Sequence, residues 1–232
     1  MSRVLLFDID GTLMNAVHGR GYRREIRAAL ESVFGTAGLI DQTRFDGKTD
    51  LAILREALEP AGIPASEIHR RMPDWEAGFI ELTHRLSAEA PLFACCPGAE
   101  QLLQRLDEDT RFDLSVLTGN LERMAGVKLA AVGLDRHIRL RGAYGSDHEN
   151  RNELPAIAAA RIAEQTGQDR PPADFMIIGD TPRDIEAARG FGMRCMAVAT
   201  GHYSLDALAA HEPDVLLADL SDTDLVMDSL LG

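Results

Sequence analysis

The chain has few cysteines, and this scarcity excludes two classes of protein. Three cysteines occur in 232 residues, and two of them, Cys95 and Cys96, are adjacent. Three thiols do not make a disulfide framework, and no second Cys or His pair lies at zinc-finger spacing. We therefore expect reduced thiols in a cytoplasmic protein.

Positive charge is scarce as well. The chain carries 24 Lys and Arg residues against 37 Asp and Glu residues, which gives a formal net charge of −13. Nucleic acids and anionic membranes are bound through a basic electrostatic field, so this balance argues against both as partners. An anionic substrate must then be held by a few local cations or by a metal ion.

Long apolar runs are absent. No run approaches the roughly 18 residues that a membrane helix needs. The apolar stretches at residues 4–7 and 176–178 have the length of strands. The N-terminal Met-Ser-Arg lacks the zones of a secretory signal. These features favour a cytoplasmic chain of one large domain or two small ones.

The hydrophobic pattern divides the chain into two parts. Between about residues 16 and 90, apolar side chains recur at helical intervals, and no convincing strand interrupts them. Elsewhere, short apolar runs alternate with helical segments, which is typical of βαβ units in a parallel sheet. The predicted strands are residues 4–7, 112–117, 141–144, 175–178, 194–199 and 215–217. The sequence thus predicts an α/β fold with a doubly wound, Rossmann-like parallel sheet (residues 1–14 and 95–232) and an inserted helical domain (residues 15–94).

Polar residues follow three of the predicted strands. They are Asp8, Asp10, Gly11 and Thr12 after the first, Thr118, Gly119 and Asn120 after the second, and Gly179, Asp180 and Asp184 after a third. Open α/β sheets bind ligands at this edge. One such carboxylate can be a simple helix cap. Their recurrence at three strands indicates a functional site.

The carboxylates in this group predict a metal ion. Asp8 and Asp10 are separated by one residue, so their side chains point to the same face of an extended segment. Close carboxylates repel, so one is protonated or a cation lies between them. Together with Asp180 and Asp184 they would form a pocket of four carboxylates. Such hard ligands suit Mg²⁺, which also takes water and phosphate oxygens.

These segments resemble motifs of the haloacid dehalogenase-like (HAD) superfamily. The segment Phe7–Leu13 reads Phe-Asp-Ile-Asp-Gly-Thr-Leu and looks like the first motif of that family. Leu117–Asn120 resembles the second motif, and Gly179–Asp184 resembles the fourth. The resemblance covers essentially the whole chain. It implies a HAD core, and it implies that the helical insert is a C1-type cap, which closes over the site.

The resemblance also implies catalytic roles. Asp8 would be the nucleophile that forms an aspartyl-phosphate. Asp10 would protonate the leaving oxygen and then activate water. Thr118 would bind a phosphate oxygen, aided by backbone N–H groups around Ile9, Gly119 and Asn120.

A metal site follows from the same resemblance. Mg²⁺ would be held by the Asp8 carboxylate, the Asp10 backbone carbonyl and Asp180, with Asp184 as a further ligand or as a partner of one. Asp184 also suits the first turn of a helix opened by Pro182, where a carboxylate interacts with the helix dipole. The two roles of Asp184 are compatible.

The third motif of the family supplies a cation, usually a lysine, beside the nucleophile. This chain has no lysine after Lys128. Arg151, just before a predicted helix, lies where the cation belongs, and we assign it this role. Arginine can hold phosphate bidentately but is not equivalent to lysine. The alternative is that Arg139 or Arg141 takes the role and Arg151 is solvated.

One turn of the helical insert is a candidate substrate contact. The residues Phe-Asp-Gly-Lys-Thr-Asp at 45–50 place Lys48 after a turn at Gly47, and Thr49 or Asp50 can cap the helix that follows. A helix N-terminus favours an anion. The segment resembles the cap specificity loop of the family, which would bring Lys48 to a substrate oxygen or carboxylate. The alternative is a solvent-exposed lysine on a turn.

Within the family, Asp10 distinguishes one chemistry from another. A dehalogenase has no leaving oxygen to protonate, so Asp10 favours phosphoryl transfer. We predict a Mg²⁺-dependent phosphatase for a small phosphorylated metabolite, similar to phosphoglycolate phosphatase-like members, because a cap excludes macromolecules. A phosphonate hydrolase with Lys48 as a Schiff base and a sugar phosphomutase are alternatives. A non-catalytic phosphate-binding protein is the alternative from another class.

Overall fold

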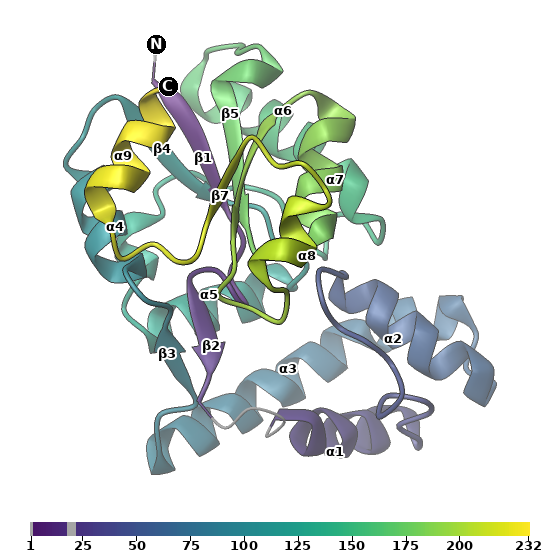
Figure 1. The fold of residues 1–232 in the computed structure, drawn as a ribbon. Coiled ribbons are helices and arrows are strands. Elements are labelled where there is room, and N and C mark those ends of the chain that lie inside the picture. The colour runs from purple at the N-terminus through teal and green to yellow at the C-terminus, as the bar shows by residue number, and fades with distance from the viewer. Residues whose placement is uncertain (1, 18–21) are drawn as a thin grey trace.

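A five-stranded parallel sheet forms the centre of the molecule (Figure 1). The computed structural model describes residues 2–17 and 22–232. The strand order is β4-β1-β5-β6-β7. The bounds are β1 (Arg3–Phe7), β4 (Phe112–Val116), β5 (Phe175–Gly179), β6 (Arg194–Val198) and β7 (Val215–Leu217). Since β1 pairs with β4 on one side and β5 on the other, the carboxyl ends of these three strands are neighbours.

Helices cover both faces of this sheet. In β1, Leu5 and Phe7 pack on one face while Val4 and Leu6 pack on the other, which explains why the run is continuously apolar. The first face is covered by α4 (Ala99–Asp107), α5 (Glu122–Ala131) and α9 (Thr223–Leu231). The second face is covered by α6 (Leu154–Thr166), α7 (Pro182–Phe191) and α8 (Leu205–Ala209). The predicted doubly wound α/β fold is confirmed.

Three helices lie together beyond the carboxyl ends of the strands (Figure 1). They are α1 (Tyr22–Phe34), α2 (Asp50–Leu58) and α3 (Ala65–Glu89), and we call them the helical insert. They enclose an apolar cluster of their own, in which Trp75 and Phe79 stack with ring centroids 5.3 Å apart. Leu121 and Met124, at the start of α5, join this cluster. The insert is therefore packed against the core as well as on itself, and its domain boundaries at residues 15 and 94 stay a prediction.

Two short strands at the base of the insert were not predicted. β2 (Met14–Ala16) and β3 (Phe93–Cys95) pair in an antiparallel ribbon, with Met14 opposite Cys95. The ribbon lies where the chain leaves β1 and where it returns toward α4. Three-residue strands are too short to show an alternating pattern, so the sequence gives no signal for them.

The predicted strand at residues 141–144 is wrong. The structure has only an isolated bridge there, between Leu117 and Ala143. The backbone N–H of Arg141 donates to the side-chain oxygen of Gln165, and the Gln165 amide donates to the Arg141 carbonyl, both at 2.9 Å. A side chain of α6 thus takes the backbone groups of Arg141, while Leu140 and Ala143 on either side still bond to the backbone of residues 114, 116 and 118.

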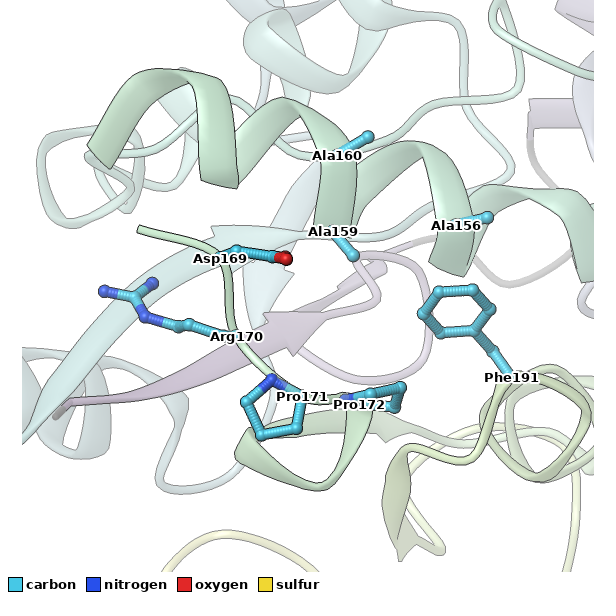
Figure 2. A pocket seen from close by; sticks show the side chains of 8 residues that line it. All are labelled: Ala156, Ala159, Ala160, Asp169, Arg170, Pro171, Pro172 and Phe191. Atoms are coloured by element: carbon cyan, nitrogen blue, oxygen red, sulfur yellow. The ribbon is translucent and has the colours of Figure 1, made fainter. Parts of the chain in front are cut away.

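The described part of the chain also contains short 3₁₀ helices, and one of them borders a surface hollow. They are η2 (Glu59–Ala61), η3 (Asp135–His137), η4 (Arg151–Glu153) and η5 (Pro172–Asp174). The hollow, of about 600 Å³, lies between α6 and η5, and Figure 2 shows its lining. The Arg170 guanidinium points away from it toward Asp113, at 2.8 Å. None of the predicted site residues lines this hollow. No helix among the described residues is long and apolar enough to cross a membrane.

Candidate active site

The carboxyl ends of β1, β4 and β5 open into one cavity between the sheet and the helical insert. Its volume is about 640 Å³. The predicted site residues that line it are Asp8, Asp10, Lys48, Thr118, Gly119, Asn120, Arg151 and Asp180. Asp184 lies behind this wall and is fully buried. Residues far apart in the sequence are thus brought together as the parallel sheet predicts.

Three carboxylates form a buried cluster in this cavity. Asp8, Asp180 and Asp184 each offer an oxygen within 4.8 Å of the others. Their exposed fractions are 5%, 4% and 0%. Nη2 of Arg151 lies 3.2 Å from Asp8 Oδ2 and also forms an ion pair with Asp184. Arg151 balances one of the three negative charges, and a divalent cation would balance the other two.

Burial changes the protonation of this cluster. Burial raises the pKa of Asp8 to about 6 against the lowering effect of Arg151, and the Asp184 charge adds to the rise. Burial and the charges of Asp184 and Asp8 raise the pKa of Asp180 well above its ordinary value. Burial alone would lower the pKa of Arg151, but Asp184 and Asp8 raise it, so the guanidinium stays charged. A bound cation would favour the ionised carboxylates.

The Asp180 carboxylate lies against glycine backbone. A Cβ on Gly11 would lie 2.3 Å from Asp180 Oδ2, and one on Gly201 would lie 1.7 Å away. Gly11 also has φ of +86°, which a residue with a side chain rarely adopts. Thr12 Oγ1 donates to Asp180 Oδ1 at 3.3 Å. The Gly-Thr pair of the first motif therefore makes room for Asp180 and binds it.

Asp184 has a structural role at the start of α7. Its Oδ2 accepts hydrogen bonds from the backbone N–H and the hydroxyl of Thr181, at 3.0 and 2.7 Å, which completes a capping box. Its Oδ1 accepts from Arg151. The expectation that Asp184 stabilises the first turn is confirmed. Metal ligation by Asp184 stays a prediction, and its protein contacts hold Arg151 beside Asp8.

Asp10 does not join the carboxylate cluster. Its side chain is 49% exposed, and both its oxygens contact Nζ of Lys128, at 2.8 and 2.7 Å. The Asn120 amide also donates to Asp10 Oδ2 at 2.8 Å. Asp10 lines the same cavity as Asp8 and Asp180, but its carboxylate lies outside the cluster of three, because Lys128 and Asn120 hold it. Ligation of a metal by the Asp10 backbone carbonyl stays a prediction.

Lys128 is the contact that sequence reasoning missed. It lies on α5, buried to 8% exposure, and its Nζ also donates to Asn120 Oδ1 at 2.6 Å. Its spacing from Leu121, Met124 and Ala125 places it on the buried face of the helix. That spacing is visible in the sequence and would have indicated that Lys128 is a buried lysine.

The loop before α2, at residues 47–49, lies in close contact with Gly119 of the second motif. A Cβ on Gly119 would lie 2.0 Å from the Lys48 carbonyl oxygen. The Asp50 N–H donates to the Gly119 carbonyl at 2.7 Å, and the Asp50 carboxylate accepts from the Leu121 N–H at 2.9 Å. Thr49 caps α2 by accepting from Ala52 N–H. The expected cap residue of α2 is thus Thr49, while Asp50 caps α5.

Lys48 lines the cavity but is held by a protein carboxylate. Its side chain is 17% exposed and forms an ion pair with Glu56. The alternative of a solvent-exposed lysine is therefore wrong. Contact between Lys48 and a substrate stays a prediction, and an anionic substrate group would compete with Glu56 for the ammonium.

The other two arginines considered for the third motif lie elsewhere. Arg139 pairs with Asp107, and Arg141 pairs with Glu122, each at 2.6 Å. Neither arginine lines the cavity. Arg151 is the candidate of the three that touches Asp8, and its catalytic role stays a prediction.

The whole chain is similar to known phosphatases. It is 29% identical over 236 residues to a validoxylamine A 7'-phosphate phosphatase of Streptomyces hygroscopicus subsp. limoneus, covering 96% of each chain. It is 24% identical over 231 residues to phosphoglycolate phosphatase 1 of Pseudomonas aeruginosa, covering 96% of this chain and 78% of that one. The fold matches the crystal structure of CbbY from Rhodobacter sphaeroides in complex with phosphate, with a TM-score of 0.68, 22% identity and 96% of each chain covered.

A family comparison agrees with the motifs. Residues 3–192 match the family model of the haloacid dehalogenase-like hydrolases. This span contains the three motifs, Arg151 and the helical insert. The chain therefore belongs to the haloacid dehalogenase-like hydrolases.

Proposed function

We propose that the protein is a Mg²⁺-dependent phosphatase that hydrolyses a small phosphate monoester through an aspartyl-phosphate on Asp8. The observation that carries the proposal is the buried cluster: Asp8, Asp180 and Asp184 lie within 4.8 Å of one another, and Arg151 lies 3.2 Å from Asp8. Relatives named as phosphoglycolate phosphatases support the same reaction. The helical insert would act as the cap over this site.

The donor set fits a hard divalent cation. Asp8 and Asp180 supply carboxylate oxygens, and the cluster carries more negative charge than Arg151 neutralises. The Asp10 backbone carbonyl would be a further ligand. Bound Mg²⁺ would neutralise the charge that develops on the phosphate oxygens and separate it from the carboxylates.

Asp8 would carry out the first step. An Asp8 oxygen attacks phosphorus, a new P–O bond forms, and the bond to the ester oxygen breaks. Arg151 neutralises Asp8 and the phosphate, while Thr118 and the N–H groups of Gly119 and Asn120 bind phosphate oxygens. Asp10 gives its proton to the leaving oxygen, which departs as an alcohol.

Asp10 would then reverse its role. The carboxylate left by the first step accepts a proton from a water molecule, and the water oxygen attacks phosphorus. The bond to Asp8 breaks, phosphate is released, and the Asp8 carboxylate is regenerated. Asp10, protonated again, is ready for the next ester. Because Asp10 is half exposed to the cavity while Asp8 is buried, the two aspartates suit these different roles.

A panel of phosphorylated metabolites, assayed for phosphate release, tests this function. Wild type with Mg²⁺ should hydrolyse several small esters, chelator should stop the reaction, and added Mg²⁺ should restore it. Asp8→Asn should abolish phosphate release. Asp135→Asn, at an exposed position, is the control for this change and should behave as wild type. Full activity in excess chelator contradicts the metal requirement. The absence of phosphate release from every ester of the panel favours the non-catalytic phosphate-binding alternative.

A further inference from the structure

We propose that Lys128 is a positioning residue for Asp10, and that it acts by holding the Asp10 carboxylate and the Asn120 amide in one arrangement beside Thr118. The inference rests on the proposed phosphatase function and deepens it. Lys128 lies outside all the motifs that identify the family. It adds a further cation to the site, distinct from Arg151 and Lys48.

The geometry around the ammonium group carries the inference. Nζ of Lys128 lies 2.8 and 2.7 Å from the two Asp10 oxygens and 2.6 Å from Asn120 Oδ1. The Lys128 side chain is 11% exposed, whereas the Asp10 side chain is 49% exposed. A buried cation therefore anchors a carboxylate that faces the cavity.

The Asn120 amide extends this contact to the phosphate-binding side. Its Nδ2 donates to Asp10 Oδ2 and to Thr118 Oγ1, both at 2.8 Å. An ammonium group only donates hydrogen bonds and a carboxylate only accepts them, so the observed amide orientation satisfies every partner. The reverse orientation would place NH₂ against NH₃⁺ and C=O against a carboxylate. Lys128 thus selects one orientation of Asn120, and through it links Asp10 to Thr118.

The helix itself has no need of a lysine at this position. Its inward neighbours on α5, Met124 and Ala125, are buried and apolar. Burying an ammonium group costs free energy unless it is paired, and an apolar side chain of similar length would fill the same space. The hydrogen bonds with Asp10 and Asn120, which belong to the site, help to repay this cost, and the nearby Asp50 carboxylate adds a favourable charge interaction.

The role predicts a dependence on the leaving group. An alkyl phosphate needs a well-placed proton donor because an alkoxide is a poor leaving group, whereas a nitrophenolate departs without one. Misplacing an acid by about 1 Å costs roughly 100-fold. Lys128→Met should therefore lower kcat/KM for an alkyl phosphate about 100-fold, and lower it for 4-nitrophenyl phosphate about fivefold or less.

The second step gives an independent readout. Asp10 must activate water whichever ester formed the aspartyl-phosphate. In Lys128→Met, 4-nitrophenyl phosphate should therefore release one equivalent of nitrophenol in a rapid burst, followed by slow turnover. A purely structural role of Lys128 would lower the burst and the turnover together.

The experiment compares four proteins. They are wild type, Lys128→Met, Lys128→Arg, which keeps the charge, and Arg123→Met, a matched cation-to-methionine control on α5 that is 62% exposed and lies 3.6 Å from Glu76. Lys128→Arg should recover at least tenfold of the loss on the alkyl ester. Arg123→Met should behave as wild type. Should Lys128→Met unfold, Lys128→Gln is measured for the same ratio of the two esters.

Two results overturn the inference. One is an equal loss on the alkyl and aryl esters, and the other is wild-type kinetics on both. Asp8→Asn in the same assay separates the proposed function from this inference. Turnover that survives Asp8→Asn contradicts the aspartyl nucleophile. An intact Asp8 requirement with no leaving-group dependence in Lys128→Met contradicts the positioning role alone.

Discussion

Asp8 and Asp10 belong to one short motif and have opposite surroundings. Asp8 is buried among two other carboxylates and one guanidinium, in a cluster with excess negative charge. Asp10 is half exposed and is held by an ammonium group and an amide. The first environment attracts a divalent cation. The second already contains its cation and leaves a carboxylate oriented toward the cavity, which suits proton transfer.

The largest effects on activity should come from substituting each of the two aspartates in turn. Asp8→Asn should abolish hydrolysis of every ester, with a loss of more than about 1,000-fold, because an amide does not attack phosphorus. Asp10→Asn should abolish turnover of alkyl esters but still release about one equivalent of nitrophenol from 4-nitrophenyl phosphate. Rapid-quench kinetics measure both. A nitrophenol burst from Asp8→Asn would contradict the division of roles.

The buried cluster should depend on Arg151 for stability. Arg151→Met removes the guanidinium between Asp8 and Asp184 and leaves buried carboxylates unpaired. We expect the free energy of unfolding to fall by about 3–5 kcal/mol. Urea unfolding measures this loss. The control is Arg105→Met, which removes an exposed pair with Asp224 away from the cavity and should cost about 1 kcal/mol or less. Equal losses would contradict the dependence of the buried cluster on Arg151.

Metal and pH should act on the cluster together. The pKa of Asp8 is raised from 3.8 to about 6, so between these values the folded protein keeps a proton that the unfolded chain has released. The stability of the metal-free protein should therefore decrease as pH rises through this window. Mg²⁺ needs ionised carboxylates, so it should raise the Tm more at about pH 7.5 than at about pH 5. Thermal unfolding with and without Mg²⁺ measures this difference. An equal shift in Asp8→Asn would contradict metal binding at the cluster.

The smallest effect concerns the remote part of the substrate. Lys48→Ala should lower kcat/KM for the best metabolite about tenfold, because a charge-assisted contact is lost, and should affect 4-nitrophenyl phosphate less. The matched control is Glu56→Gln, which frees Lys48 from its ion pair and should not reproduce this loss. Trapping of wild type by borohydride in the presence of a phosphonoaldehyde would instead favour a Schiff base on Lys48. Unchanged kinetics across the panel would remove Lys48 from the site.

The sheet and its helices could be predicted because their patterns are strong. β1 is buried on both faces and reads as a continuous apolar run, and α6 repeats apolar residues at helical intervals. The failures are local. Met14–Ala16 is too short for a pattern, and the expected strand at 141–144 is replaced by side-chain hydrogen bonds from Gln165. A contact made across 24 residues by a side chain leaves no mark on local hydropathy.

The site residues that follow strands were predictable from the sequence. The helical side chain that contacts one of them from a distant part of the chain was not. Asp8 and Asp180 come directly after their strands and Thr118 one residue later, so topology alone places them together. The contact between Lys128 and Asp10 spans 118 positions, and a helical lysine ordinarily extends to solvent. Two signals were available: the helical spacing of Lys128 from buried residues, and the small number of lysines, since only two of the 24 basic residues are lysines and both line the cavity.

The contact between Asp50 and the start of α5 has a consequence for protein engineering. Asp50 belongs to the helical insert, yet it accepts from the Leu121 N–H and so caps a helix of the core. That helix carries Lys128 seven residues further on, against Asp10. A chimera that exchanges the insert for one from another hydrolase would therefore also change the N-terminus of α5. Such a graft should carry an acceptor at the position of Asp50, or the exchange intended to alter substrate choice will also disturb proton transfer.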